Sequence, residues 1–119
     1  MAVHNELGKK GEELAVEFLQ KKGFQILERN WRFKKAEIDI ISLKNDVLAV
    51  IEVKTRSTSY FGNPQDFVNE KKIQLLVEAV NEYVISKDLD VDVRFDIVAI
   101  LKSKNSFNVE HLEDAFLHF

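Results

Sequence analysis

Two runs of branched apolar residues, separated by three polar residues, predict a β-hairpin near the middle of this chain. The runs are AEIDIISL (36–43) and VLAVIEVKT (47–55), and Lys44, Asn45 and Asp46 lie between them. β-Branched residues bounded by a short polar turn are typical of paired antiparallel strands. Both faces of this pair are largely apolar, so we expect other elements of the fold to cover it on both sides.

The segments on either side of the hairpin predict an α/β sandwich. Some have apolar residues at helical spacing and others are β-rich, so we expect helices over 5–22 and 67–86, and strands over 24–33, 91–101 and 107–110. A strand separated from the hairpin by a helix can join it in parallel, which makes the central sheet mixed. The order αβββαββ over residues 1–119 predicts a single domain, because the chain is too short for two.

Composition excludes several classes of protein. The chain has no cysteine, which excludes a disulfide framework, a thiolate zinc site and a cysteine nucleophile. No uninterrupted apolar run is longer than that of Val47 to Ile51, which is far shorter than the roughly 20 residues that span a bilayer. The first residues lack the apolar stretch of a secretion signal, so we expect a cytoplasmic protein without a membrane partner.

Charge is distributed unevenly along the chain. Residues 1–72 carry a net charge of +2, residues 73–119 carry −5, and the total is −3 at pH 7. This balance argues against a protein that coats nucleic acid through charge alone. The acidic segment 78–114 predicts a docking surface for protein partners. A local basic patch remains within seven residues: Arg29, Arg32, Lys34 and Lys35.

The hairpin register decides where its charged residues lie. If positions 45 and 46 form a two-residue turn, Asp39 lies directly opposite Glu52. Because side chains alternate along a strand, Lys54 shares the face of Asp39 and Glu52, whereas Ile38 and Ile40 share the other face. A slip of one residue would put the two carboxylates on opposite faces.

Two facing carboxylates in an apolar hairpin predict a metal site. At about 4 Å they repel by roughly 4 kcal/mol at an effective dielectric constant of 20, and a divalent cation between them reverses that term. Asp39 and Glu52, with a backbone carbonyl near Val53, would make an open Mg²⁺ site. Lys54 can orient or deprotonate an attacking water, or stabilise charge on a phosphate. The alternative is that Asp39, Glu52 and Lys54 form an inert ion-pair cluster.

One charged residue beside the apolar stripe of each predicted helix is a candidate for the site. Glu12 lies about 100° from the centre of the first helix's apolar face. It is next to Gly8, whose missing side chain leaves room for a metal, a water or a phosphate. Lys72 flanks the apolar stripe of the second helix and can reach the site or a nucleic-acid backbone, whereas Lys71 points to solvent. The alternatives are an ordinary helix-border glutamate and an exposed lysine along the core edge.

The remaining polar residues favour structural roles. Asp96 follows Arg94 by two residues, so we expect an ion pair of Asp96 with Arg94 or with Arg56. Trp31 lies in a β-rich segment, where a tryptophan is more typical of a core than of a base-stacking surface. The three histidines are dispersed and are interpreted as surface residues without the spacing of metal ligands: His4, His111 and His118.

Seven short motifs follow one another over nearly the whole chain. They are Gly8-x-x-Gly11-Glu12, Arg29-Asn30-Trp31-Arg32, Glu37-Ile38-Asp39-Ile40-Ile41, Ile51-Glu52-Val53-Lys54-Thr55-Arg56, Phe61-Gly62-x-Pro64, Lys72 and Arg94-Phe95-Asp96-Ile97-Val98. With these motifs the chain resembles the YraN-like family of small bacterial proteins. That family is similar to the PD-(D/E)XK nucleases and to archaeal Holliday-junction resolvases.

The resemblance implies a restriction-endonuclease-like fold, a three-layer sandwich with a mixed central sheet flanked by helices. It implies that Glu12, Asp39 and Glu52 hold Mg²⁺ or Mn²⁺ and that Lys54 is the catalytic lysine. The implied activity is metal-dependent cleavage of phosphodiester bonds in DNA, in branched or single-stranded structures of repair or recombination. The alternative is a catalytically inactive nucleic-acid-binding or adaptor module of the same fold.

The resemblance implies DNA as the ligand, and a homodimer is a further expectation. The charge distribution adds the expectation that protein partners use the acidic C-terminal part of the chain. Six cations are expected to contact the nucleic acid: Arg29, Arg32, Lys34, Lys35, Arg56 and Lys72.

Overall fold

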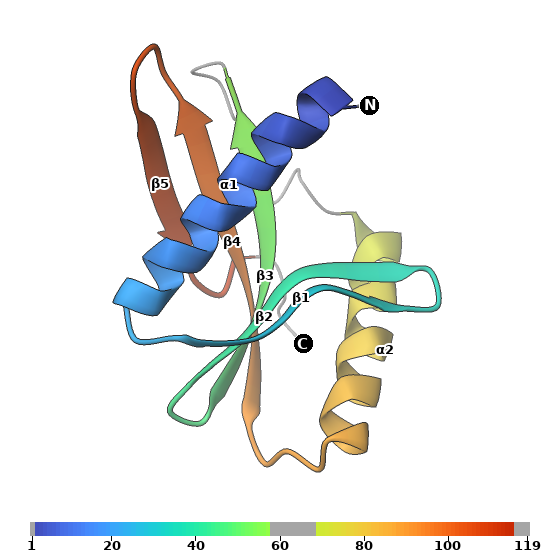
Figure 1. Ribbon diagram of the computed structural model, residues 1–119. Coiled ribbons are helices and arrows are strands. Elements are labelled where there is room, and N and C mark those ends of the chain that lie inside the picture. The colour runs from blue at the N-terminus through green and yellow to red at the C-terminus, as the bar shows by residue number, and fades with distance from the viewer. Residues whose placement is uncertain (1, 58–68, 116–119) are drawn as a thin grey trace.

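The computed structural model of the chain describes residues 2–57 and 69–115, which form two helices and five strands (Figure 1). The elements are α1 (Ala2–Lys21), β1 (Gln25–Phe33), β2 (Ala36–Lys44), β3 (Val47–Arg56), α2 (Glu70–Ser86), β4 (Asp92–Lys102) and β5 (Phe107–Leu112). Their order confirms the predicted αβββαββ arrangement. The Phe61-Gly62-x-Pro64 motif and the predicted helix start at Phe67 lie outside the described residues.

The five strands form one mixed sheet in the order β1-β2-β3-β4-β5. β3 and β4 are parallel and the other neighbouring pairs are antiparallel, as expected for a strand that returns through α2. Neither of the described helices is long and apolar enough to cross a membrane.

The helices cover opposite faces of the sheet and give the fold three layers. α1 contributes Ala15 and Leu19 to one apolar cluster, which includes Ile40 and Ile51 of the central strands. α2 packs on the other face, where its buried residues join a second cluster: Leu76, Ala79, Val80 and Tyr83. This α/β/α arrangement is consistent with the predicted restriction-endonuclease-like fold.

Gly11 sets the close approach of α1 to β3. A Cβ atom at this position would overlap Thr55 Oγ1, and the other Thr55 side-chain atoms would lie within 3.1 Å of it. A Cβ atom at Gly8, one turn earlier, would meet nothing within 4 Å. The two glycines of the first motif therefore have different surroundings: Gly11 packs on a strand and Gly8 borders open space.

The hairpin between β2 and β3 has the predicted register. Leu43 pairs with Leu48 and Lys44 pairs with Val47, so residues 45 and 46 form the two-residue turn. The paired segment ends at Ile40 and Ile51, one position before Asp39 and Glu52. The two strands separate there, and the carboxylates lie where the ladder opens.

The prediction that Ile38 and Ile40 share a face is wrong. Ile40 belongs to the cluster beneath α1, whereas Ile38 belongs to the cluster beneath α2. The pairs Arg29–Ile40 and Trp31–Ile38 place Asn30 across from Asp39. Asn30 has a left-handed backbone, with φ 52°, which breaks strict alternation. The side chains of β1 and β2 therefore switch from one face of the sheet to the other at Asn30 and Asp39.

Helix α2 begins at Glu70 with an asparagine cap. Asn69 has extended backbone angles, and its side-chain oxygen accepts a hydrogen bond from the backbone N–H of Lys72 at 2.8 Å. An asparagine in this role satisfies one of the unpaired N–H groups at a helix start. The cap fixes the backbone of Lys72 in the first turn of α2.

Candidate functional site

Two cavities flank the point where β2 separates from β3. The α1 cleft, with a volume of about 760 Å³, lies among α1, β1 and β3, and the α2 pocket, of about 290 Å³, lies among β2, β3 and α2. Asp39 lines both cavities, and Glu52 lines the α2 pocket with it. The α1 cleft also contains charged or polar side chains from three elements: Glu12, Arg29, Asn30, Lys54 and Arg56.

Asp39 bridges the opening between the two strands. Its Oδ2 atom accepts a hydrogen bond from the backbone N–H of Val53 at 2.8 Å. The carboxylate oxygen thus takes the place of a β2 backbone carbonyl as the acceptor for this N–H group. Burial, and then the nearby Glu52 carboxylate, raise the pKa of Asp39 to about 7 despite this hydrogen bond. The positive charge around Asp39 is therefore too small to offset its burial and the repulsion from Glu52.

Glu52 is a buried carboxylate that contacts two ammonium groups. The residue is 7% exposed, and its Oε2 atom lies 2.6 Å from Lys72 Nζ and 3.7 Å from Lys54 Nζ. The predicted proximity of Glu52 and Lys54 is confirmed, and Lys72 reaches the same carboxylate from α2. Helical spacing predicts Lys72 near the site, but it does not predict the ion pair of Lys72 with Glu52.

Glu12 faces the α1 cleft as the helical spacing predicts. Its side chain is 19% exposed, against 57% for Glu13. The Oε1 atom of Glu12 accepts a hydrogen bond from Asn30 Nδ2 at 3.0 Å and lies 3.5 Å from Arg29 Nη2. Asn30 was not predicted as a site residue, although it lies within a quoted motif and across from Asp39.

The three predicted metal ligands are not gathered around one point. Among residues 2–57 and 69–115, no three carboxylate or imidazole side chains lie close enough to hold a metal ion together. Asp39 and Glu52 line one pocket, whereas Glu12 is engaged by Asn30 across the α1 cleft. Mg²⁺ typically uses one or two protein carboxylates and keeps several waters, so Asp39 and Glu52 together fit that ion.

The six predicted nucleic-acid contacts fall into three places. Arg29 and Arg56 line the α1 cleft, and Lys35 and Lys72 line the α2 pocket. The other two cations line neither of these cavities and instead form ion pairs around the turn between β1 and β2: Arg32 with Glu37 at 3.3 Å and Lys34 with Glu78 at 3.9 Å.

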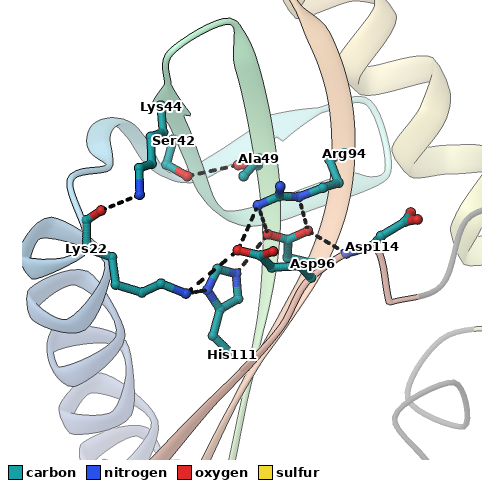
Figure 2. Close-up of polar contacts among 9 residues, drawn as sticks. Lys22, Ser42, Lys44, Ala49, Arg94, Asp96, His111 and Asp114 are labelled. Atoms are coloured by element: carbon teal, nitrogen blue, oxygen red, sulfur yellow. Dashed lines mark hydrogen bonds and ion pairs between the residues drawn. The ribbon is translucent and has the colours of Figure 1, made fainter.

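A second polar cluster surrounds Asp96 on β4 (Figure 2). The predicted ion pair with Arg94 is confirmed, with Nε 2.9 Å from Oδ1 and Nη2 3.0 Å from Oδ2. Burial opposes ionisation of Asp96, but hydrogen bonds from His111, Arg94 and the backbone N–H of Asp114 outweigh it and hold the pKa of Asp96 below its usual range. This cluster compensates its own buried charge.

The interpretation of His111 as a surface residue is wrong. Its side chain is 2% exposed, and Nε2 lies 2.8 Å from Asp96 Oδ2 while Nδ1 lies 2.8 Å from Lys22 Nζ. Because an ammonium can only donate, Nδ1 accepts from Lys22 and Nε2 donates to Asp96. Spacing could not reveal this role, since Lys22 is 89 residues away in the sequence. The side chains of His4 and His118 lie outside the described part of the chain.

Comparison with known sequences identifies similar proteins over the whole site. The chain matches the model of a family described as "Uncharacterised protein family UPF0102" over residues 11–100. It is 66% identical to a UPF0102 protein of Flavobacterium psychrophilum and 61% identical to one of Christiangramia forsetii, over 100% of both chains in each case. A UPF0102 protein of Bacteroides thetaiotaomicron is 42% identical over 98% of this chain and 96% of its own length.

Proposed function

The chain belongs to the UPF0102 family, the YraN-like family that its motifs resemble, and on that premise we propose that it is a metal-dependent phosphodiesterase acting on DNA. One observation carries the proposal. Two carboxylates on neighbouring strands, Asp39 and Glu52, line one pocket where the strands separate, and burial together with Glu52 raises the pKa of Asp39 to about 7. A divalent cation would compensate both charges.

Each residue of the candidate site has a distinct role in this proposal. Asp39 and Glu52 would hold Mg²⁺ or Mn²⁺, which supplies positive charge for the phosphate and lowers the pKa of water. Glu12 would be the third metal ligand, as the family resemblance implies. To reach the metal, Glu12 would have to break its hydrogen bond with Asn30. Lys54 is the catalytic lysine, because its Nζ lies 3.7 Å from Glu52 Oε2 and the residue lines the α1 cleft with Asp39.

The cations that line the α1 cleft favour a phosphate backbone as the substrate. Arg29 and Arg56 line it beside Lys54, and guanidinium groups bind phosphate oxygens in a bidentate manner. The family resemblance favours DNA with branched or single-stranded features, as formed in repair or recombination. The homodimer and the cytoplasmic location stay predictions of the sequence.

A cleavage assay tests this function. Forked, gapped, single-stranded and four-way DNA substrates would be incubated with the protein and Mn²⁺. Asp39→Asn should lower cleavage at least about a hundredfold, as expected for loss of a metal ligand or charge-stabilising group. Asp46→Asn is the matched control, because it removes an exposed carboxylate at the other end of the hairpin. Equal cleavage by purified wild type and Asp39→Asn would refute the proposed activity.

A second candidate function keeps DNA binding without catalysis. The observation that favours it is the ion pairing of Glu52 with Lys72 and Lys54, which neutralises that carboxylate without any metal. An adaptor of this kind would dock proteins through the exposed acidic face of α2, which carries Glu78 and Glu82. DNA binding should weaken steeply with salt, whereas a mainly apolar protein interface should not. DNA binding with no cleavage of any substrate would favour this function.

A further inference from the structure

The contact between Lys72 and Glu52 joins the first turn of α2 to the candidate metal site. Lys72 Nζ donates to Glu52 Oε2 at 2.6 Å, the shorter of the two ammonium contacts of this carboxylate. Because Glu52 is 7% exposed, its ionised form needs a positive partner. Lys72 therefore provides the compensation that the proposed function assigns to a divalent cation.

An ammonium and a divalent cation cannot compensate the same oxygen equally well at the same time. They repel each other, and the α2 pocket that contains Asp39, Glu52 and Lys72 is only about 290 Å³. A metal held by Asp39 and Glu52 would lie beside the Lys72 ammonium or in its place. Metal binding and the Lys72–Glu52 ion pair are thus competing arrangements.

Lys72 can leave Glu52 without any change in the helix. Its side chain is 37% exposed, whereas the Glu52 side chain is 8% exposed. Its backbone N–H remains fixed by the Asn69 cap, so only the flexible side chain has to move. A lysine has a four-carbon stem and a compact charge, which suits such an exchange.

From this geometry we infer that Lys72 is an exchangeable cation of Glu52, which holds the site closed to metal and is displaced when metal and a substrate phosphate bind. The inference rests on the proposed function. Lys35 lines the same α2 pocket, so the displaced ammonium would be one of two cations there that can bind a phosphate next to the metal. Binding of metal and binding of nucleic acid are therefore positively coupled through Lys72.

Calorimetric titration with Mn²⁺ tests the competition directly. Lys72→Met keeps most of the apolar stem and removes the charge, so Mn²⁺ should bind about tenfold more tightly, within the usual range of coupling between sites. Lys72→Arg keeps a cation and should bind Mn²⁺ like the wild type. Lys71→Met is the matched control, since it removes the same charge from the exposed neighbouring position. Lys72→Gln provides a second neutral variant if Lys72→Met fails to fold.

The outcomes separate this inference from the proposed function. Tighter binding by the neutral Lys72 variants, with Lys72→Arg and Lys71→Met unchanged, supports the exchange. Equal or weaker binding by the neutral variants, with Mn²⁺ still bound by the wild type, overturns the exchange and leaves the proposed function standing. Absence of Mn²⁺ binding in every protein overturns the inference together with the metal-dependent function.

A second titration measures the coupling to nucleic acid. A fluorescent single-stranded oligonucleotide would be bound in EDTA and in Ca²⁺, for the wild type and for Lys72→Met. Metal should strengthen oligonucleotide binding in the wild type at least about fivefold more than in Lys72→Met, because only the wild type releases an ammonium. The same gain in both proteins would overturn the role of Lys72 in phosphate binding.

Discussion

The Asp39 carboxylate accepts a hydrogen bond from the backbone N–H of Val53 at 2.8 Å, and these two residues lie one and two positions beyond the last β2–β3 pair. A side chain thus replaces a main-chain partner where the sheet opens. From this level the hairpin of β1 and β2 bends away from the central strands (Figure 1). The opening gives Asp39 access to cavities on both sides, and it leaves Asp39 partly buried near the Glu52 carboxylate.

The first prediction concerns the pH dependence of stability. The pKa of Asp39 is about 7 in the folded chain and near 4 when unfolded, so the folded state retains a proton that the unfolded state has lost. The contribution of Asp39 to stability therefore falls as pH rises from about 4 to 7. Asp39→Asn should become progressively more stable than the wild type over that range, as measured by urea unfolding in EDTA.

Mg²⁺ provides the control for this measurement. A cation at the site favours ionised Asp39, so the advantage of Asp39→Asn at pH 8 should shrink as Mg²⁺ is added. A stability difference between the two proteins that stays constant from pH 4 to 8 would show that Asp39 titrates normally.

The second prediction compares the two glycines of α1. Gly11→Ala should destabilise the protein by about 1–3 kcal/mol, because its Cβ overlaps Thr55 Oγ1 and forces α1 away from β3. Gly8→Ala should be neutral or stabilising by up to about 1 kcal/mol, because alanine favours the helix and its Cβ meets no atom within 4 Å. Urea unfolding of both variants checks this. Equal effects would contradict the packing of α1 on β3.

The third prediction concerns the cluster around Asp96. Asp96→Ala should destabilise the fold by about 3 kcal/mol, because it removes the buried carboxylate that Arg94 and His111 Nε2 both contact. Asp92→Asn, an exposed change on the same strand, should cost less than about 0.5 kcal/mol. Urea unfolding at pH 7 measures both effects.

The same cluster has a defined acid dependence. Because the folded pKa of Asp96 is lowered, its contribution to stability is present above about pH 4 and is lost as pH falls through the folded value. The difference between wild type and Asp96→Ala should therefore be steady from pH 8 to 5 and decrease in stronger acid. A difference that grows on acidification would be inconsistent with this account.

The fold was largely predictable from local patterns. The two-residue turn, the apolar runs and the helical spacing are local signals, and each predicted element is present within a few residues of its predicted bounds. The Asn69 cap at the start of α2 was not predicted, because a capping side chain leaves no mark on the apolar pattern. The face of Ile38 was wrong because alternation assumes a regular strand, and the left-handed Asn30 breaks it.

Most residues of the candidate site could be predicted from the sequence, whereas the contacts between them were harder to predict. Asp39, Glu52 and Lys54 were placed by strand register, which depends only on the turn. The pairing of Lys72 with Glu52 depends on how α2 packs on the sheet, which no spacing within the sequence determines. The burial of His111 likewise depends on contacts with β4 and the end of α1.

The central claim is that Asp39 and Glu52 hold a divalent cation. Crystals grown with Mn²⁺ would test it most directly, because anomalous scattering locates the ion without any assumption about activity. We predict an anomalous peak within coordination distance of both carboxylates, with Lys72 Nζ displaced from Glu52. Crystals with Mn²⁺ elsewhere, or with no bound Mn²⁺ and the Lys72–Glu52 ion pair intact, would contradict the claim.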